Sequence, residues 1–139
     1  MTKHQISYKS GYKYQLVEEY QVEISVTPEK NIQTNYIDLT TEGLLTIKNG
    51  YAWDGPSGPT IDTPNFMRGS LVHDALYQLM RNKLIDKEKW RKKADGDLKR
   101  MCVEDGMSRI RAWWVHEAVR CCGDSAASEG MRKEVKKAP

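Results

Sequence analysis

The chain has 139 residues, with 22 lysines and arginines against 19 acidic residues and a net charge of +3. This length is typical of a single domain, and an apolar fraction of 39% is too high for a disordered chain. No stretch approaches the ~18–20 consecutive apolar residues of a membrane span. The first residues lack the apolar core of a signal peptide, so we expect synthesis in the cytosol without export by that route.

The charge is unevenly distributed along the chain. Residues 1–62 carry five lysines and eight acidic residues, a net charge of −3, whereas residues 81–111 carry eleven basic and six acidic residues, a net charge of +5. A basic segment of this kind touches phosphates or an acidic partner, or it forms a solvated helix face. We expect the solvated face, which is the commoner case.

The first half of the chain is predicted to form an antiparallel sheet. Between residues 12 and 26, seven of the eight even positions are apolar, which indicates one long half-buried strand or a hairpin that turns near Glu18–Glu19. A second alternating region follows, with a turn at Glu42–Gly43 and a turn or bulge at Asn49–Gly50. Its apolar positions are Tyr36 to Leu39, then Leu45, Ile47, Tyr51 and Trp53.

The second half is predicted to form three helices. The first begins at Thr63–Pro64, a good N-cap followed by proline at the first helical position. Its apolar stripe is Phe66, Ser70, His73, Leu76/Tyr77, Met80 and Leu84.

The second helix begins at Asp86 and stops near Gly106, with Trp90, Ala94, Leu98 and Met101/Cys102 on its core face. Ser108 caps the third, residues 109–122, and Gly123 follows its end. Because the third helix is apolar on most sides, we expect it to be central or part of an interface. The fold class is therefore α+β, an N-terminal antiparallel β-meander of three or four strands followed by three packed α-helices. Residues 1–123 form the domain and residues 124–139 a flexible basic tail.

Candidate functional residues gather where the two halves meet. The segment from Tyr51 to Thr60 is rich in glycine and proline and contributes Asp54 and Ser57. On the helix that follows, His73 lies within the apolar stripe and Asp74 at its edge, while Asp95 borders the core face of the next helix.

Two interpretations of this set remain open. As catalytic residues, Asp54, Ser57, His73 and Asp74 supply a nucleophile, a base and carboxylates, and His73, Asp74 and Asp95 supply ligands for a divalent metal ion. In the alternative, the same groups form a structural hydrogen-bond network that pins the loop to the helices. No organic cofactor is predicted.

Between residues 45 and 123 the chain carries five short motifs. They are Gly50-Tyr51, Asp54-Gly55-x-Ser57-x-Pro59, His73-Asp74-x-Leu76-Tyr77, Ala94-Asp95 and Val119-Arg120-x-x-Gly123. In these motifs the chain resembles a bacteriophage and prophage family that carries a domain-of-unknown-function label. It departs from the family pattern at Pro56 and at Gly58-Pro59-Thr60. The resemblance implies a phage origin and a compact α+β fold, with no established reaction.

Two further patterns bear on function. Cys102, Cys121 and Cys122 are odd in number and lack the usual zinc spacing, which favours reduced thiols. Trp113 and Trp114 are adjacent on one helix and therefore ~100° apart, so we expect one of them in the core. We therefore expect neither a base-stacking surface nor a nucleic-acid partner.

Two functional hypotheses of different classes follow. The first is a phage structural or accessory protein that docks, through the helix at residues 109–122, on other phage proteins including virion subunits, or on itself. It is expected in the host cytoplasm or assembled into the virion. The second is a small metal- or His/Asp-dependent hydrolase with its site at Asp54, His73, Asp74 and Asp95.

Overall fold

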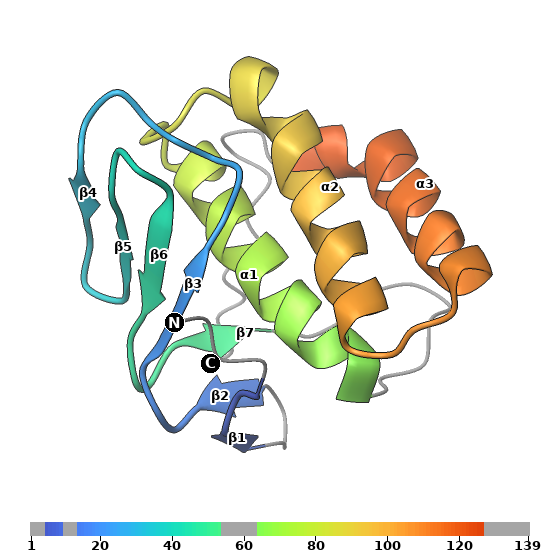
Figure 1. The fold of residues 1–139 in the computed structure, drawn as a ribbon. Helices are drawn as coiled ribbons and strands as arrows, with labels where there is room; N and C mark the ends of the chain where they lie inside the picture. Colours follow the sequence, from blue (N-terminus) through green and yellow to red (C-terminus); the bar gives the residue numbers. More distant parts are fainter. Residues whose placement is uncertain (1–4, 10–13, 54–63, 127–139) are drawn as a thin grey trace, which may run out of the picture.

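The computed structural model describes residues 5–9, 14–53 and 64–126, and it confirms the predicted α+β fold (Figure 1). Seven short strands precede three helices, and the strands form two antiparallel sheets with the orders β1-β2-β7 and β3-β6-β5-β4. The strands are β1 (Tyr8–Lys9), β2 (Tyr14–Leu16), β3 (Tyr20–Glu23), β4 (Ile32–Gln33), β5 (Ile37–Leu39), β6 (Leu44–Ile47) and β7 (Ala52–Trp53).

The predicted alternation sets which strand residues are buried. In β3 the pattern alternates, with Tyr20 and Val22 buried and Gln21 and Glu23 exposed. Tyr20 lies opposite Ile47 of β6, and Ile37 of β5 lies opposite Ile47 on its other side. One face of the larger sheet is therefore apolar and covers the core.

Two glycines turn the chain where the sequence predicted turns. Gly43, between β5 and β6, has φ +88°, and Gly50, between β6 and β7, has φ +96°, a backbone region that side-chain-bearing residues rarely adopt. The Asn49–Gly50 turn carries the chain out of the larger sheet, so β7 pairs with β2 in the smaller one.

The predicted strand or hairpin across residues 12–26 is wrong in its pairing. β2 and β3 belong to different sheets and do not pair with each other, and the chain bends between them at residues 17–19. Leu16 and Tyr20 are nevertheless both buried, because the two short strands contribute to one core from different sheets.

The first two helices begin where capping residues predicted. α1 (Pro64–Arg81) starts with the expected proline, and Asp86 caps α2 (Lys87–Glu104) by accepting a hydrogen bond from the Glu88 amide. The predicted stripe of α1 fails at Leu84, which is exposed because the helix has already ended. Lys83 turns the chain with φ +59°, and Ile85 is buried in its place.

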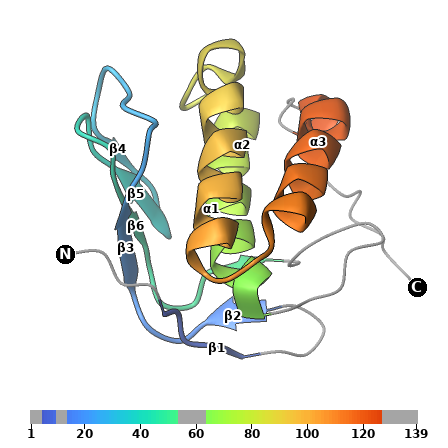
Figure 2. The ribbon, with the colours of Figure 1, turned by 45° about the vertical axis from the view of Figure 1, so that its right-hand side comes forward.

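The third helix, α3 (Arg109–Ala126), lies on the outside of the fold and is not its central helix. Figure 2 shows the larger sheet, the α1–α2 pair and α3 one after another. Ser108 accepts a hydrogen bond from the Arg111 amide, as expected of an N-cap. The helix runs to Ala126, past the end predicted at Cys122, so Gly123 is helical and does not terminate it.

Two clusters of buried side chains hold these layers together. The larger joins both sheets to α1 and α2, and the smaller joins α1, α2 and α3. Among the helices of the described part, none is long and apolar enough to cross a membrane. The smaller cluster consists of Phe66, Leu98, Cys102, Met107, Ala112 and Val115.

Candidate functional site

Asp95 is the centre of a polar network between the three helices. Its side chain is 0% exposed, and one oxygen, Oδ1, lies 2.7 Å from His73 Nε2 and 2.6 Å from the Tyr77 hydroxyl. The other oxygen, Oδ2, accepts a hydrogen bond of 2.9 Å from Arg120 Nη1 and lies 3.7 Å from Arg91 Nη1. A buried carboxylate with this many partners is stable only because they replace the water it has lost.

Helical periodicity explains why most of these partners lie near Asp95. His73 and Tyr77 are four residues apart on α1 and therefore lie on the same face, with their rings 4.1 Å apart between centroids. Arg91 precedes Asp95 by four residues on α2 for the same reason. Arg120 comes from α3, so this single carboxylate ties all three helices together.

The network fixes the charge of Asp95. Burial opposes ionisation, but the hydrogen bonds from His73, Tyr77 and Arg120 outweigh it and hold the pKa of Asp95 below its ordinary value of 3.8. The ionised carboxylate carries no proton, so His73 Nε2–H donates to it. In the neutral imidazole, Nδ1 then keeps the lone pair.

Tyr77 is held as a neutral donor. Burial, followed by the hydrogen bond to Asp95 and the negative charge of that carboxylate, raises the pKa of Tyr77 well above its ordinary value of 10.0. The phenol therefore stays protonated at any physiological pH, and it anchors the carboxylate rather than acting as a base.

The structure brings together two of the predicted site residues. His73 and Asp95 are in direct contact, and the His73 side chain is 12% exposed, so the imidazole reaches the surface. Asp74, half-buried, follows His73 on α1. Asp54 and Ser57 lie outside the described residues.

The predicted metal site has no counterpart in the described part of the chain. No group of three His, Cys, Asp or Glu side chains suited to holding an ion occurs there. Cys102 is a buried free thiol and Cys121 an exposed one.

Sequence reasoning missed three partners of Asp95 as site residues. Tyr77 and Arg91 carried a local signal, because each stands four residues from a predicted site residue on its own helix. Arg120 is 25 residues from Asp95 along the chain, and only the packing of α3 against α2 brings the two together. Arg91 also donates to the carbonyl of Val119, which fixes that packing further.

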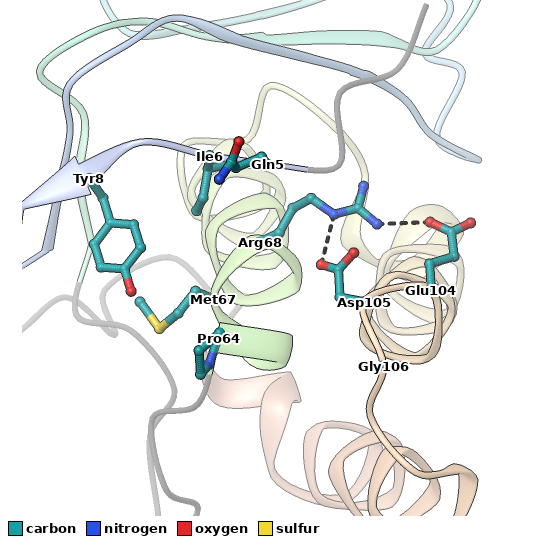
Figure 3. A pocket seen from close by; sticks show the side chains of 9 residues that line it. All are labelled: Gln5, Ile6, Tyr8, Pro64, Met67, Arg68, Glu104, Asp105 and Gly106. Atoms are coloured by element: carbon teal, nitrogen blue, oxygen red, sulfur yellow. Dashed lines mark hydrogen bonds and ion pairs between the residues drawn. The ribbon is translucent and has the colours of Figure 1, made fainter.

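A second polar cluster surrounds Arg68 on α1, whose guanidinium is almost fully buried (Figure 3). Its Nε donates to Asp105 Oδ2 at 2.9 Å, its Nη2 to Glu104 Oε1 at 2.8 Å and its Nη1 to the Tyr20 hydroxyl at 3.0 Å. Arg68 therefore joins the sheet to the end of α2.

The Arg68 cluster forms one wall of a cavity of about 610 Å³. Because two carboxylates already neutralise the guanidinium, this wall presents no unbalanced positive charge to an anionic ligand. Of the predicted site residues that the structure describes, His73, Asp74 and Asp95, none lines the cavity. Its lining is Gln5, Ile6, Tyr8, Pro64, Met67, Arg68, Glu104, Asp105 and Gly106.

The outer face of α3 exposes three large apolar side chains. Ile110 is 75% exposed, Trp113 47% and Trp114 65%. The two indoles contact each other edge to face, with centroids 5.2 Å apart. The prediction that one of them is in the core is wrong, because α3 buries only the narrow face of Ala112 and Val115 and leaves a wide arc exposed.

Comparison with known proteins finds no similar protein. No family model matches the chain, and no curated protein or solved structure matches it.

Proposed function

We propose that the protein is a bacteriophage structural or accessory protein, a rigid α+β module that docks on another protein through the outer face of α3. The exposed cluster of Ile110, Trp113 and Trp114 carries this proposal. Tryptophan is enriched at the energetic centres of protein interfaces, and large apolar side chains gathered on one surface favour a partner. The phage origin rests on the sequence resemblance, and the host cytoplasm or the virion is the location that it implies.

The inner face of α3 supports this role because it is firmly held. Ala112 and Val115 are buried against α2, and Arg120 is hydrogen-bonded to the buried carboxylate of Asp95. The outer side chains are therefore presented on a fixed helix, so little conformational entropy is lost when a partner binds. The Asp95 network in this interpretation is architectural.

Charge selects a partner with an apolar centre and an acidic rim. Between residues 109 and 121, α3 carries Arg109 and Arg111 in addition to Arg120, which is already paired with Asp95, against the single glutamate Glu117. A second copy with its α3 in parallel orientation would bring Arg109 and Arg111 of both helices together, which opposes self-association in that orientation. An acidic rim on another protein would complement them.

The test is photo-crosslinking in the cells or particles in which the protein is made. A crosslinking amino acid at position 114 should give one discrete adduct, and the same residue at the exposed control position 29 should give none. The partner identified in that adduct, once purified, should bind a Trp114→Ser variant at least about 10-fold more weakly, a loss of ~1.4 kcal/mol. Unchanged affinity, or the same adducts at both positions, would refute the proposal.

A second candidate function is a hydrolase that uses His73, and the contact between His73 and the buried Asp95 favours it. A carboxylate that orients an imidazole while the imidazole reaches the surface is the arrangement of a general base, with Nδ1 here as the accepting nitrogen. In this proposal Asp54, Ser57 and Asp74 supply the remaining groups or the metal ligands.

Metal analysis distinguishes the two candidates. Near-stoichiometric zinc, manganese or calcium in the purified protein, lost in a His73→Ala variant that circular dichroism shows to be folded, would establish the metal site and refute a purely architectural role. A metal-free protein that unfolds on the same substitution would refute the metal-dependent hydrolase.

A further inference from the structure

We infer that the outer face of α2 binds a nucleic-acid backbone without reading its sequence. This face, called the lysine face, consists of Lys89, Lys92, Lys93 and Lys99 with Gly96 at its centre. At ~100° per residue all four lysines lie within about 60° of Gly96 around the helix axis. The inference does not depend on the docking role of α3, which uses a different surface.

The two acidic residues beside Gly96 on α2 face the interior of the fold. Asp95 and Asp97, which flank Gly96 in the sequence, are both buried: Asp95 in the network described above, and Asp97 against the backbone amide and hydroxyl of Ser25. Glu88 and Glu104, nearer the ends of the helix, are exposed. Within the described part of the chain, none of the four lysines is paired with a carboxylate, so the middle of the outer face of α2 is positive.

This arrangement costs stability that the fold recovers only in part. Lys89 and Lys93 are a like-charge pair at i,i+4, which destabilises a helix. Contact of both side chains with Trp90, at 5.0 and 5.6 Å from the ring centroid, offsets part of this cost but leaves the face positive. Glycine in a helix interior is also destabilising relative to alanine.

Gly96 has no packing reason to be glycine. A Cβ added there would meet no atom within 4 Å, whereas a Cβ on Gly69 in α1 would meet Leu98 at 2.9 Å. A bare backbone at the centre of a positive face allows a ligand chain to approach closely. The glycine and the uncompensated lysines are therefore both explained by one ligand.

The chemistry of the face favours nucleic acid over an acidic protein. The face offers no apolar or aromatic anchor at its centre, and lysine is depleted from protein interfaces. Its length, from Lys89 to Lys99, is ~15 Å at 1.5 Å per residue, and a duplex presents about one phosphate charge per 1.7 Å of its axis. Contacts of the four lysines with phosphates carry no sequence information, so the binding that we infer is sequence-independent.

The inference is tested by fluorescence anisotropy of the full chain with a labelled 20-base-pair duplex at pH 7 in 50–200 mM NaCl. With four phosphate contacts, the logarithm of the association constant should fall linearly with the logarithm of the salt concentration, with a slope of at least about 3.6 in magnitude. This slope should be the same for two duplexes of unrelated sequence. Lys92→Gln/Lys99→Gln should reduce that magnitude by about 1.8. The matched control, Lys9→Gln/Lys30→Gln, removes the same charge from exposed positions elsewhere and should leave the slope unchanged.

A Gly96→Gln variant tests whether the nucleic-acid backbone must approach the helix closely, independently of the charge of the lysine face. It should weaken binding without reducing the salt slope, because it adds bulk and removes no cation. No binding at 50 mM NaCl would overturn the inference, as would an equal loss of slope in the control variant. Poly-glutamate that competes as well as the duplex, at equal charge, would show a general polyanion surface and refute a nucleic-acid site. Circular dichroism of each variant confirms that it is folded.

Discussion

Replacement of Asp95 by asparagine is the most direct test of how the three helices are held together. The substitution keeps the size of the side chain but removes the charge that His73, Tyr77 and Arg120 contact at 2.6–2.9 Å. Because Asp95 is completely buried, water does not reach this position, and Arg120, whose side chain is 30% exposed, loses its carboxylate partner. Removing one partner of a buried ion pair costs about 3–5 kcal/mol.

Urea unfolding followed by circular dichroism measures this cost. With a dependence of about 2 kcal/mol per molar urea, a loss of 3 kcal/mol lowers the midpoint by roughly 1.5 M. Glu29→Gln is the control, because it removes a carboxylate from an exposed position and should change the free energy of unfolding by less than about 0.5 kcal/mol. If Asp95→Asn changed it by no more than this control, the network would not be holding the helices.

Acid sensitivity gives an independent check of the same carboxylate. The pKa of Asp95 is lowered in the folded protein, and in the unfolded chain an aspartate titrates near ~3.9. Its contribution to stability is therefore complete above about pH 5 and is lost as the pH falls through the lower folded value. The difference in unfolding free energy between the native protein and Asp95→Asn should shrink between pH 5 and pH 2. A constant difference would contradict the assigned charge.

Three further predictions concern packing and reactivity. Gly69→Ala should destabilise the protein by about 1–3 kcal/mol in urea unfolding, because the new Cβ would lie 2.9 Å from a side-chain carbon of α2. Gly96→Ala, in contrast, should stabilise it by up to about 1 kcal/mol. The reverse order of stabilities would refute the α1–α2 packing. Burial raises the pKa of Cys102 to about 12, so peptide mass spectrometry after alkylation at pH 8 should find Cys121 modified and Cys102 protected until the chain unfolds. Arg68→Met should lower the unfolding free energy by about 3–5 kcal/mol, because it leaves the carboxylates that Arg68 joins without their cation; a loss below about 1 kcal/mol would show that water replaces it.

The sequence by itself determined the elements and most of the buried residues, because these follow from short-range patterns. The even positions from Leu16 to Val26 are buried apart from Glu18, as period two predicted. Asp86 and Ser108 begin helices because a side-chain oxygen that accepts from a nearby backbone amide acts within a few residues. Local rules of this kind need no knowledge of the rest of the molecule.

The sequence also proposed that His73 and Asp95 meet, because both lie at the apolar face of their own helix. It did not predict the long-range partners. Arg120 reaches Asp95 only because α3 packs on α2, and Arg68 joins Tyr20 of the sheet to the end of α2 across 36 to 48 residues of chain. No local pattern carries that information.

Only the tertiary structure decided which faces are left exposed. The alternation of β2 and β3 is the same whether or not they pair, so periodicity could not show that they lie in different sheets. An apolar helix is expected to be central or part of an interface, and the structure places α3 outermost, where it exposes Ile110 and Trp114. The sequence predicted a solvated basic face on this segment, but only the packing of α2 showed that Asp95 and Asp97 are buried while the lysine face is left in solvent. Local sequence determines which residues share a face, but the packing of whole elements determines whether that face meets the core or the solvent.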